Sequence, residues 1–276
     1  MIYADKVILG AAQLGLHYGI ANQHGQPSLD QARKILESAA ENGIKRIDTA
    51  VAYGSSQAVL GQIHEKRFDL MSKWVEHPSD LSQTLKLLKT EKLDVWMAHR
   101  SDVILKNPSL WRIMRDQQAK GLVRSIGVSV YGTSQVQALL DVDIVPDVVQ
   151  LPLNILSKVE IEAIKKLKEV GITIHARSIF LQGLLLCNPK SLHSFFDPIK
   201  PWLEALSKSF STTKSRVQAL IQAVLDHPAI DFVVLGAESP TQIHDWFDSD
   251  VSNTEELPSI PDSLPEQILN PTMWPR

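Results

Sequence analysis

Four side chains of complementary chemistry occur within the first hundred residues of the chain: Asp48, Tyr53, Lys73 and His99. A phenol of ordinary pKa, about 10, is a poor proton donor near neutral pH unless a cation stabilises the phenolate that remains. Lys73 could supply that cation, Asp48 could hold the ammonium, and His99 could donate to a carbonyl oxygen and orient it. This set suits carbonyl reduction with Tyr53 as proton donor, and the hydride would have to come from a cofactor.

Each of these residues alone has a plainer structural explanation as a surface group, a cap or a packed histidine. Their positions argue for chemistry, because each one ends or closely follows a short apolar run that predicts a strand. Asp48 ends the second such run, with Tyr53 in the loop after it, and Lys73 and His99 end the third and fourth. Ser129 and Gln150 end the fifth and sixth runs. If the strands form one barrel, all of these residues meet at its mouth.

The elements that must position these residues alternate along the whole chain. The predicted strands are Val7–Leu9, Arg46–Thr49, Phe68–Ser72, Leu93–Ala98, Ser125–Val128, Val148–Gln150, Thr173–Ala176 and Phe232–Leu235. The predicted helices are Ser28–Asn42, Gln57–Glu65, Ser79–Leu88, Ser109–Ala119, Thr133–Leu140, Lys158–Glu169, Thr213–Asp226 and Pro240–Phe247. Ser28 and Ser157 are placed to cap helices, and Gly43, Gly121 and Gly171 to end them.

Eight strand–helix units in unbroken alternation predict an α/β fold, a closed (β/α)8 TIM barrel formed as a single domain over residues 1–276. The alternative is an open doubly wound sheet. It has little support, because residues 10–15 after the first strand lack the G-x-G-x-x-G spacing of dinucleotide-binding sheets. Two segments interrupt the alternation, Phe180–Lys200 and a Pro-rich tail from about residue 257. The tail should run extended over the surface, and either segment could line a site.

Composition narrows the function classes. Hydrophobic residues make up 44% of the chain and the formal net charge is −3, so a large core is expected and no basic footprint for nucleic acid is present. The single cysteine, Cys187, allows no internal disulfide and no zinc-type Cys/His spacing, so no metal is expected. The absence of an apolar N-terminal run and of any long apolar stretch favours a cytoplasmic protein that does not interact with membranes.

Several segments of the chain resemble the aldo-keto reductase family, in its bacterial branch. Residues 46–61 are similar to the family's D-T-A-x-x-Y-G-x-S-E-x-x-L-G signature, which covers Asp48 and Tyr53. Ser72-Lys73 resembles the family's T-K, and the stretch that ends in His99 resembles its D-x-x-x-x-H. The resemblance implies an NAD(P)H-dependent oxidoreductase that reduces an aldehyde or ketone, a small-molecule carbonyl substrate, and a monomer.

The resemblance also implies a cofactor site in the second half of the chain. Residues 124–129 are similar to the family's R-x-I-G-V-S, and Gln150 with Asn154 to its Q-x-x-x-N; in the family the Ser and the Gln hold the nicotinamide amide. Residues 178–185 resemble the segment around the pyrophosphate, and residues 236–242 the one that meets the adenosine phosphate. The expected cofactor-binding residues are Ser129, Gln150, Arg177, Ser178, Leu181, Gly183, Gly236, Ser239 and Gln242.

The chain departs from the family at several of these positions. Val130 stands where the family has Asn, Arg177 where many members have a Tyr that stacks on the nicotinamide, and Gln57 where the signature has Glu. Gly236 and Gln242 replace a Lys and an Arg that clamp the 2′-phosphate in NADPH-specific members. Backbone amides around Ser239 could still bind a phosphate, so the resemblance implies NADPH, with NADH as the alternative.

Tyr18, Trp74 and Arg100 are expected to line the substrate pocket, with the tail near Trp274 as a further wall. Two other functions stay open at this point. A nucleotide-binding sensor or subunit on the same barrel, with little turnover, would fit the departures at Val130 and Gly236. A lyase that uses Lys73 as a Schiff-base amine would fit a free lysine at a barrel mouth.

Overall fold

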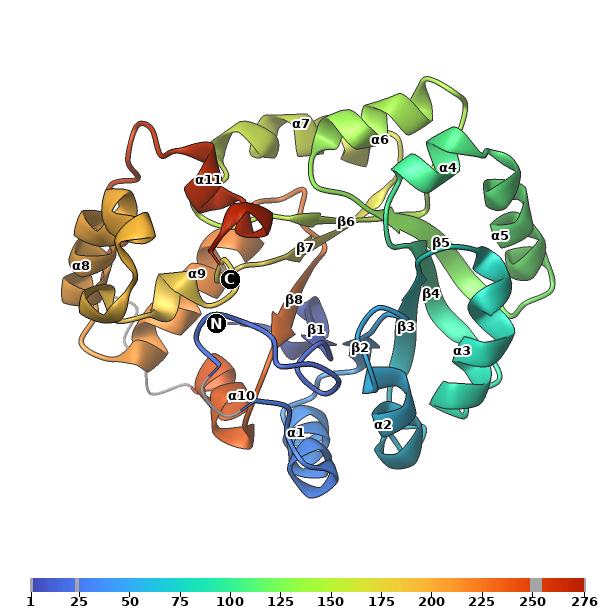
Figure 1. Cartoon of the computed structure of the whole chain (residues 1–276), viewed down its shortest axis with the longest axis horizontal. Helices are drawn as coiled ribbons and strands as arrows, with labels where there is room; N and C mark the ends of the chain where they lie inside the picture. The colour runs from blue at the N-terminus through green and yellow to red at the C-terminus, as the bar shows by residue number, and fades with distance from the viewer. Residues whose placement is uncertain (1, 23–24, 249–254, 276) are drawn as a thin grey trace.

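A computed structural model describes residues 2–22, 25–248 and 255–275 (Figure 1). Eight parallel strands pair in chain order, and β8 pairs with β1 to close a barrel. The strands are β1 (Val7–Gly10), β2 (Arg46–Asp48), β3 (Asp69–Trp74), β4 (Leu93–Ala98), β5 (Val123–Ser129), β6 (Val148–Pro152), β7 (Thr173–Arg177) and β8 (Phe232–Gly236). The predicted (β/α)8 barrel is therefore confirmed.

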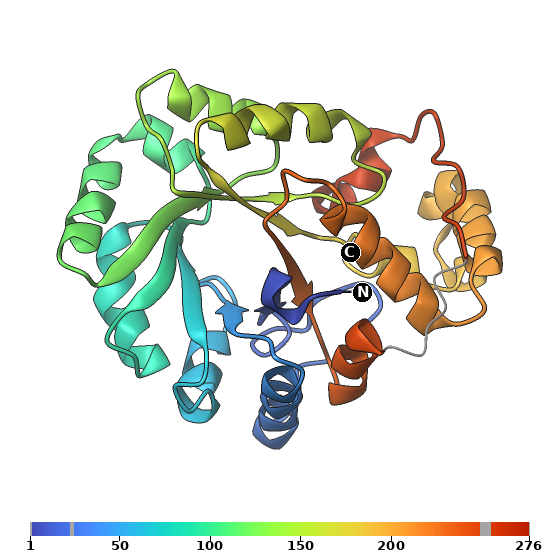
Figure 2. The same ribbon diagram turned by 180° about the vertical axis from the view of Figure 1, so that it is seen from behind.

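Helices surround the barrel on all sides, as the front and rear views show (Figures 1 and 2). They are α1 (Leu29–Glu41), α2 (Ser56–Ile63), α3 (Leu81–Leu88), α4 (Asp102–Lys106), α5 (Ser109–Ala119), α6 (Thr133–Leu140), α7 (Lys158–Glu169), α8 (Lys200–Ser209), α9 (Thr213–Leu225), α10 (Pro240–Phe247) and α11 (Glu266–Leu269). All eight predicted helices are present, with bounds that differ from the prediction by no more than two residues. Helices α4, α8 and α11 were not predicted.

Capping chemistry fixes several helix ends. The Ser28 side chain accepts a hydrogen bond from the Gln31 amide, and Gln31 Oε1 accepts one from the Ser28 amide, which completes a capping box at the start of α1. Gly43, Gly121 and Gly171 follow helices with φ of 83°, 74° and 82°, the left-handed region that suits glycine. The predicted cap at Ser157 is wrong, because its hydroxyl accepts from the amide of Asn154 instead of capping α7.

The interior of the barrel is filled by apolar side chains that point inward from alternate positions of the strands. This cluster comprises Ile8, Met71, Val95, Met97 and Val148, with Phe232 and Val234 packed against it. Successive side chains of a strand point to opposite faces, so the residue two positions further along each strand also points inward. Beyond the apolar side chains, the next inward-facing residues are the polar ones at the carboxyl ends of the strands.

The segment after β7 forms a second, smaller core beside the barrel. It contains three 3₁₀ turns, η3 (Leu184–Leu186), η4 (Pro189–Ser191) and η5 (Ser194–Ile199), followed by α8. Phe196, Trp202 and Leu206 are buried there. The tail packs on this core through Ile268 and through Trp274, whose ring meets that of Phe196 edge-on at 5.0 Å.

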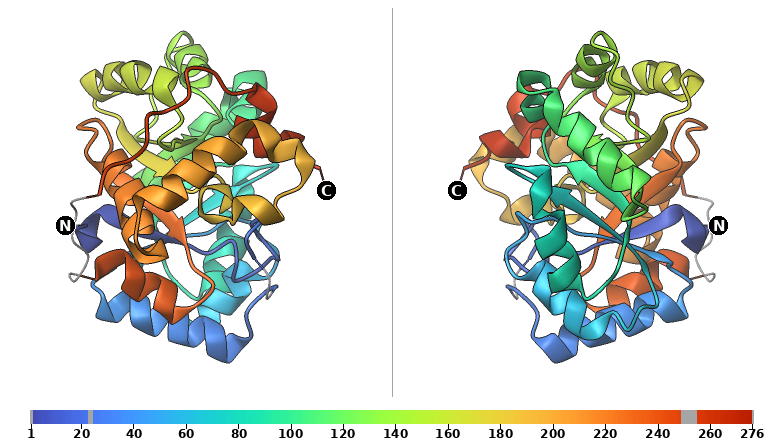
Figure 3. Two further views of the ribbon diagram at one scale, coloured as in Figure 1. Left: turned by 90° about the vertical axis from the view of Figure 1, so that its left-hand side faces the viewer. Right: turned by 90° about the vertical axis from the view of Figure 1, so that its right-hand side faces the viewer.

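The described part of the tail contains no long helix, as predicted: α11 is a single turn and η6 (Pro271–Met273) another. The two ends of the chain lie on opposite faces of the barrel (Figure 3). In the described parts of the chain, no helix has the length and apolar character needed to cross a membrane.

Candidate active site

The alternation of side chains along each strand brings the polar candidates together. Lys73 lies two residues beyond the inward-facing Met71, Gln150 two beyond Val148, and Asp48 ends β2 beside them. Lys73, Asp48 and Gln150 are all buried, with relative exposures of 1–2%. These three polar side chains therefore lie together in a buried layer next to the apolar interior, where each depends on the others for its hydrogen bonds.

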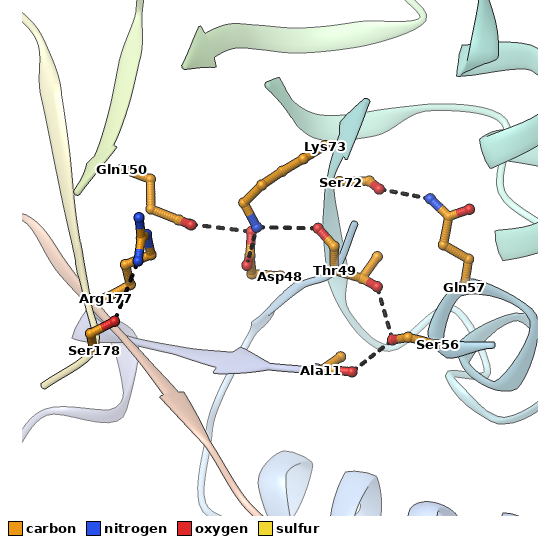
Figure 4. Close-up of polar contacts among 10 residues, drawn as sticks. All are labelled: Ala11, Asp48, Thr49, Ser56, Gln57, Ser72, Lys73, Gln150, Arg177 and Ser178. Atoms are coloured by element: carbon orange, nitrogen blue, oxygen red, sulfur yellow. Dashed lines mark hydrogen bonds and ion pairs between the residues drawn. The ribbon is translucent and has the colours of Figure 1, made fainter. Parts of the chain in front are cut away.

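An ion pair joins two of these residues. The ammonium Nζ of Lys73 lies 2.5 Å from Asp48 Oδ2 and donates a second bond to the carbonyl of Thr49 at 3.3 Å. The other Asp48 oxygen, Oδ1, accepts from Gln150 Nε2 at 3.3 Å (Figure 4). A buried charge is tolerated only when it is paired and hydrogen-bonded, and this lysine meets both conditions. Its Nζ is thus occupied by Asp48 and by the Thr49 carbonyl, which does not suit the Schiff-base role proposed for a lyase.

Tyr53 and His99 lie next to this pair. The ammonium of Lys73 is 5.2 Å from the centroid of the Tyr53 ring, and the rings of Tyr53 and His99 meet edge-on with centroids 6.0 Å apart. Burial, together with the charges of Lys73 and Arg177, lowers the pKa of His99 to about 4. The imidazole is therefore neutral at physiological pH and carries one N–H that can be donated.

The loop that carries Tyr53 is fixed by contacts among buried polar groups. Ser56 Oγ donates to the carbonyl of Ala11 at 2.7 Å and bonds to the Thr49 hydroxyl at 2.9 Å (Figure 4). Gly15 packs against the same loop so closely that a Cβ there would lie 1.9 Å from the Tyr53 carbonyl oxygen. These contacts tie the loop after β1 to the loop after β2 and set the position of the Tyr53 backbone.

A cavity of about 310 Å³ opens beside these residues. Its lining includes nine residues that the sequence singled out: Tyr18, Asp48, Tyr53, Gln150, Arg177, Ser178, Gly183, Gly236 and Gln242. Its opposite end lies between α9 and α10, at Thr213, Asp245 and Trp246. The cavity is therefore elongated and runs from the Lys73–Asp48 pair to the helices that flank β8.

Other candidate residues do not line this cavity. Lys73, Ser129 and His99, which lie at or next to the carboxyl ends of their strands, are not among its lining residues; Ser129 is 5% exposed. Leu181 is buried in the second core, and Ser239 caps α10 by accepting from the Gln242 amide.

Two substrate-pocket predictions are not supported by the geometry. Trp74 is fully buried in the main core, because it follows the inward-facing Lys73 and so points to the outer face of the sheet. The side chain of Arg100 is 61% exposed and pairs with Asp102. Trp274 packs on Phe196 and also lies outside the cavity lining.

Arg177 reaches across the end of β6. Its guanidinium donates to the carbonyl of Val130 at 3.1 Å and lies 5.1 Å from the centre of the Tyr131 ring. Burial raises the pKa of the neighbouring Tyr18, an effect that the charge of Arg177 opposes. The Tyr18 phenol and the Arg177 guanidinium thus share the wall of the cavity at its catalytic end.

The loop after β7 forms the side of the cavity and holds an unusual backbone. Ser178, Leu181 and Gln182 have φ of 61°, 48° and 52°, in the left-handed region that residues other than glycine rarely adopt, and Gly183 follows at 94°. Such a run persists only where the surrounding structure enforces it, and it is common at ligand sites. The sequence pointed to this segment through the family resemblance and through the break in the strand–helix alternation that begins at Phe180.

Sequence reasoning missed several cavity residues. Gln13 comes from the loop after β1, and Thr213, Val217, Asp245 and Trp246 come from helices α9 and α10. The helical residues have no local signal, because they belong to the inner faces of amphipathic helices and resemble ordinary core or surface positions. No cluster of metal-ligating side chains occurs among the described residues.

A closed barrel with a cavity at the carboxyl ends of its strands is the architecture of barrel enzymes. The sequence model of the Aldo/keto reductase family matches residues 6–259, and the chain belongs to this family of oxidoreductases that act on carbonyl groups.

Three known proteins show how similar this chain is to its relatives in sequence and in fold. Aldo-keto reductase YhdN from Bacillus subtilis is 23% identical over 283 residues, which cover 88% of this chain and 84% of that protein. Protein REDOX 2 from Catharanthus roseus is 25% identical over 172 residues, which cover 50% of this chain and only 53% of that protein. The solved structure of aldo-keto reductase AKR11C1 from Bacillus halodurans, in its holo form, has a TM-score of 0.69 at 18% identity and covers 87% of this chain and 85% of its own. The structural likeness shows the shared fold.

Proposed function

We propose that this protein uses NAD(P)H to reduce the carbonyl group of a small aldehyde or ketone to an alcohol, with Tyr53 as the proton donor. The observation that carries the proposal is the buried Lys73–Asp48 pair, whose ammonium lies 5.2 Å from the Tyr53 ring at the catalytic end of the cavity. Loss of a proton from Tyr53 leaves a phenolate, which a neighbouring cation stabilises. Asp48 positions the ammonium, and Lys73 stabilises the phenolate.

His99 has a separate role in this proposal. Because its pKa is lowered to about 4, it stays neutral while Tyr53 gives up its proton. A neutral imidazole can donate one hydrogen bond to the substrate oxygen and so orient the carbonyl toward Tyr53. Its Nδ1 is buried and has no hydrogen-bond partner among the described residues.

The residues present fit a dinucleotide. Gln150 lines the cavity, and its carbonyl oxygen Oε1 is buried without a hydrogen-bond partner in the described structure, so it can accept from the carboxamide of a nicotinamide. The loop that contains Ser178 and Gly183 would hold the pyrophosphate. The bound cofactor supplies the hydride, and the chain supplies the proton, the orientation of the carbonyl and the exclusion of water.

Replacement of Tyr53 by Phe tests the proposal. Tyr53→Phe removes one oxygen and should lower kcat on a panel of aldehydes and ketones by about 10²–10⁴-fold. Binding of the reduced cofactor, followed by fluorescence titration, should persist. Tyr3→Phe is the matched control, because Tyr3 is a phenol that is 67% exposed, next to the N-terminal end of β1. Wild-type turnover by Tyr53→Phe would refute the assigned role, and cofactor binding without turnover in the wild-type protein would favour the nucleotide-binding sensor.

A further inference from the structure

The two ends of the cavity differ in chemistry. If the proposed function holds, the nicotinamide must lie at the Tyr53 end, where the carbonyl is reduced. The adenosine half of the cofactor then extends to the other end of the same cavity, which Glu238, Gln242, Asp245 and Trp246 line. The groups at this far end therefore decide whether a ribose with a 2′-phosphate or one with a free 2′-hydroxyl is accepted.

The far end of the cavity is acidic. It carries two carboxylates, Glu238 and Asp245, whereas the one basic residue among the described cavity-lining residues is Arg177, at the catalytic end. Lys214 lies outside the lining and is engaged with acidic groups: its Nζ pairs with Asp248 and lies 3.8 Å from Asp245. A phosphate monoester carries a charge of about −1.5 to −2 at neutral pH, so this end of the cavity opposes it.

The start of α10 offers little to a phosphate, although a helix N-terminus normally favours anions. Its first residue, Pro240, has no N–H. The amide of Gln242 donates to Ser239 Oγ at 3.3 Å, and the amide of Glu238 donates to Gln242 Oε1 at 2.7 Å. The Gln242 side chain is thus folded back over the turn, and two backbone donors that a phosphate could use are already occupied.

The end of β8 carries no cation either, because residue 236 is a glycine. Gly236 packs against Gln13, so that a Cβ at Gly236 would lie 2.3 Å from Gln13 Nε2. A lysine at position 236 would require the Gln13 side chain to move. The neutral side-chain amide of Gln13 covers the end of β8 instead. The occupied amides and the carboxylates therefore act against a 2′-phosphate.

We infer that Glu238 selects the cofactor and that the protein binds NADH in preference to NADPH, contrary to the NADPH expected from the family resemblance. A free ribose hydroxyl can donate a hydrogen bond to a carboxylate, whereas a phosphate is repelled by it. Repulsion between a phosphate dianion and one carboxylate a few ångströms away in water changes affinity by about tenfold. The charge of Asp245 is partly offset by Lys214 at 3.8 Å, so Glu238 makes the larger contribution, and together they should favour NADH by at least about tenfold.

Equilibrium titration of the purified protein with NADH and with NADPH, by calorimetry, tests this inference without any need for a substrate. The Kd for NADH should be at least about tenfold lower than that for NADPH. Glu238→Gln removes one charge with little change in shape and should lower this ratio by about tenfold through tighter binding of NADPH. Asp245→Asn, a second variant, should act in the same direction. Asp116→Asn, at an exposed position on α5, is the matched control and should leave the ratio unchanged.

The outcomes separate the two proposals. Equal or tighter binding of NADPH by the wild-type protein would overturn the inference while it supports the proposed function. An unchanged ratio in Glu238→Gln would overturn the role of Glu238. Binding of neither dinucleotide would overturn the proposed function itself.

Discussion

His175 makes the stability of the barrel sensitive to acid. Its side chain is 2% exposed, points into the barrel from β7 and meets the Phe232 ring edge-on at 5.2 Å. Its Nδ1 has no hydrogen-bond partner among the described residues. Burial, reinforced by the charge of Lys73, lowers the pKa of His175 to about 3. The native protein therefore holds this imidazole neutral under conditions in which the unfolded chain protonates it.

The sign and size of the effect follow from linkage. In the unfolded chain the pKa is about 6.5, so below that pH the unfolded state takes up a proton that the native state refuses until about pH 3. The free energy of unfolding should thus fall as the pH is lowered through this window, by about 3 kcal/mol between pH 7 and pH 4 from His175 alone. His99, whose pKa is about 4, contributes in the same direction.

Replacement of His175 by Leu removes this contribution and suits the apolar interior formed by Met71, Val148 and their neighbours. The free energy of unfolding should be measured by urea titration at pH 7 and at pH 4 for both proteins. The free energy of unfolding of His175→Leu minus that of the wild type should be about 3 kcal/mol more positive at pH 4 than at pH 7. An equal difference at the two pH values would show that His175 titrates normally in the native state and would refute the reasoning.

Two other substitutions test the site. Lys73→Met should lower turnover by about 10²–10⁴-fold and destabilise the fold by about 3–5 kcal/mol, because Asp48 is left buried without its cation. The double variant with Asp48→Asn should regain most of that stability but no activity, and turnover near the wild-type level in either protein would contradict the role of the cation. Gly15→Ala should cost about 1–3 kcal/mol and reduce turnover, since the new Cβ would lie 1.9 Å from the Tyr53 carbonyl oxygen and 2.4 Å from the Ser56 amide. Unchanged melting temperature and activity would show that the two loops can separate.

The barrel was predictable because its signals are local and repeated. Each strand is a short apolar run and each helix is an amphipathic stretch, and the spacing of the eight units leaves few alternatives to closure. The insertion after β7 was not predictable in the same way. Helix α8 and its turns bury Phe196 and Trp202 in a core that Leu220 and Ile268 complete, and these two residues are distant in sequence.

The candidate site was predictable where strand alternation applies and less so elsewhere. The third strand was predicted to end at Ser72, two residues before Trp74. The observed β3 continues to Trp74, so alternation turns its indole outward, away from the inward-facing Lys73. The side chains from α9 and α10 could not be assigned to the cavity, because their exposure depends on how the helices pack over β8.

Some residues of the family signature face the cavity, and others hold the surrounding elements together. Asp48 and Tyr53 face the cavity, whereas Gln57 is 4% exposed and donates through Nε2 to Ser72 Oγ at 2.8 Å and to Thr84 Oγ1 at 3.2 Å. These bonds join α2 to β3 next to Lys73 and so fix the distance between the loop of Tyr53 and its cation. A glutamate here would place a negative charge in a buried site without a cation among these partners, at a cost in desolvation. The replacement of the family's Glu by Gln therefore keeps the positioning role and avoids that cost.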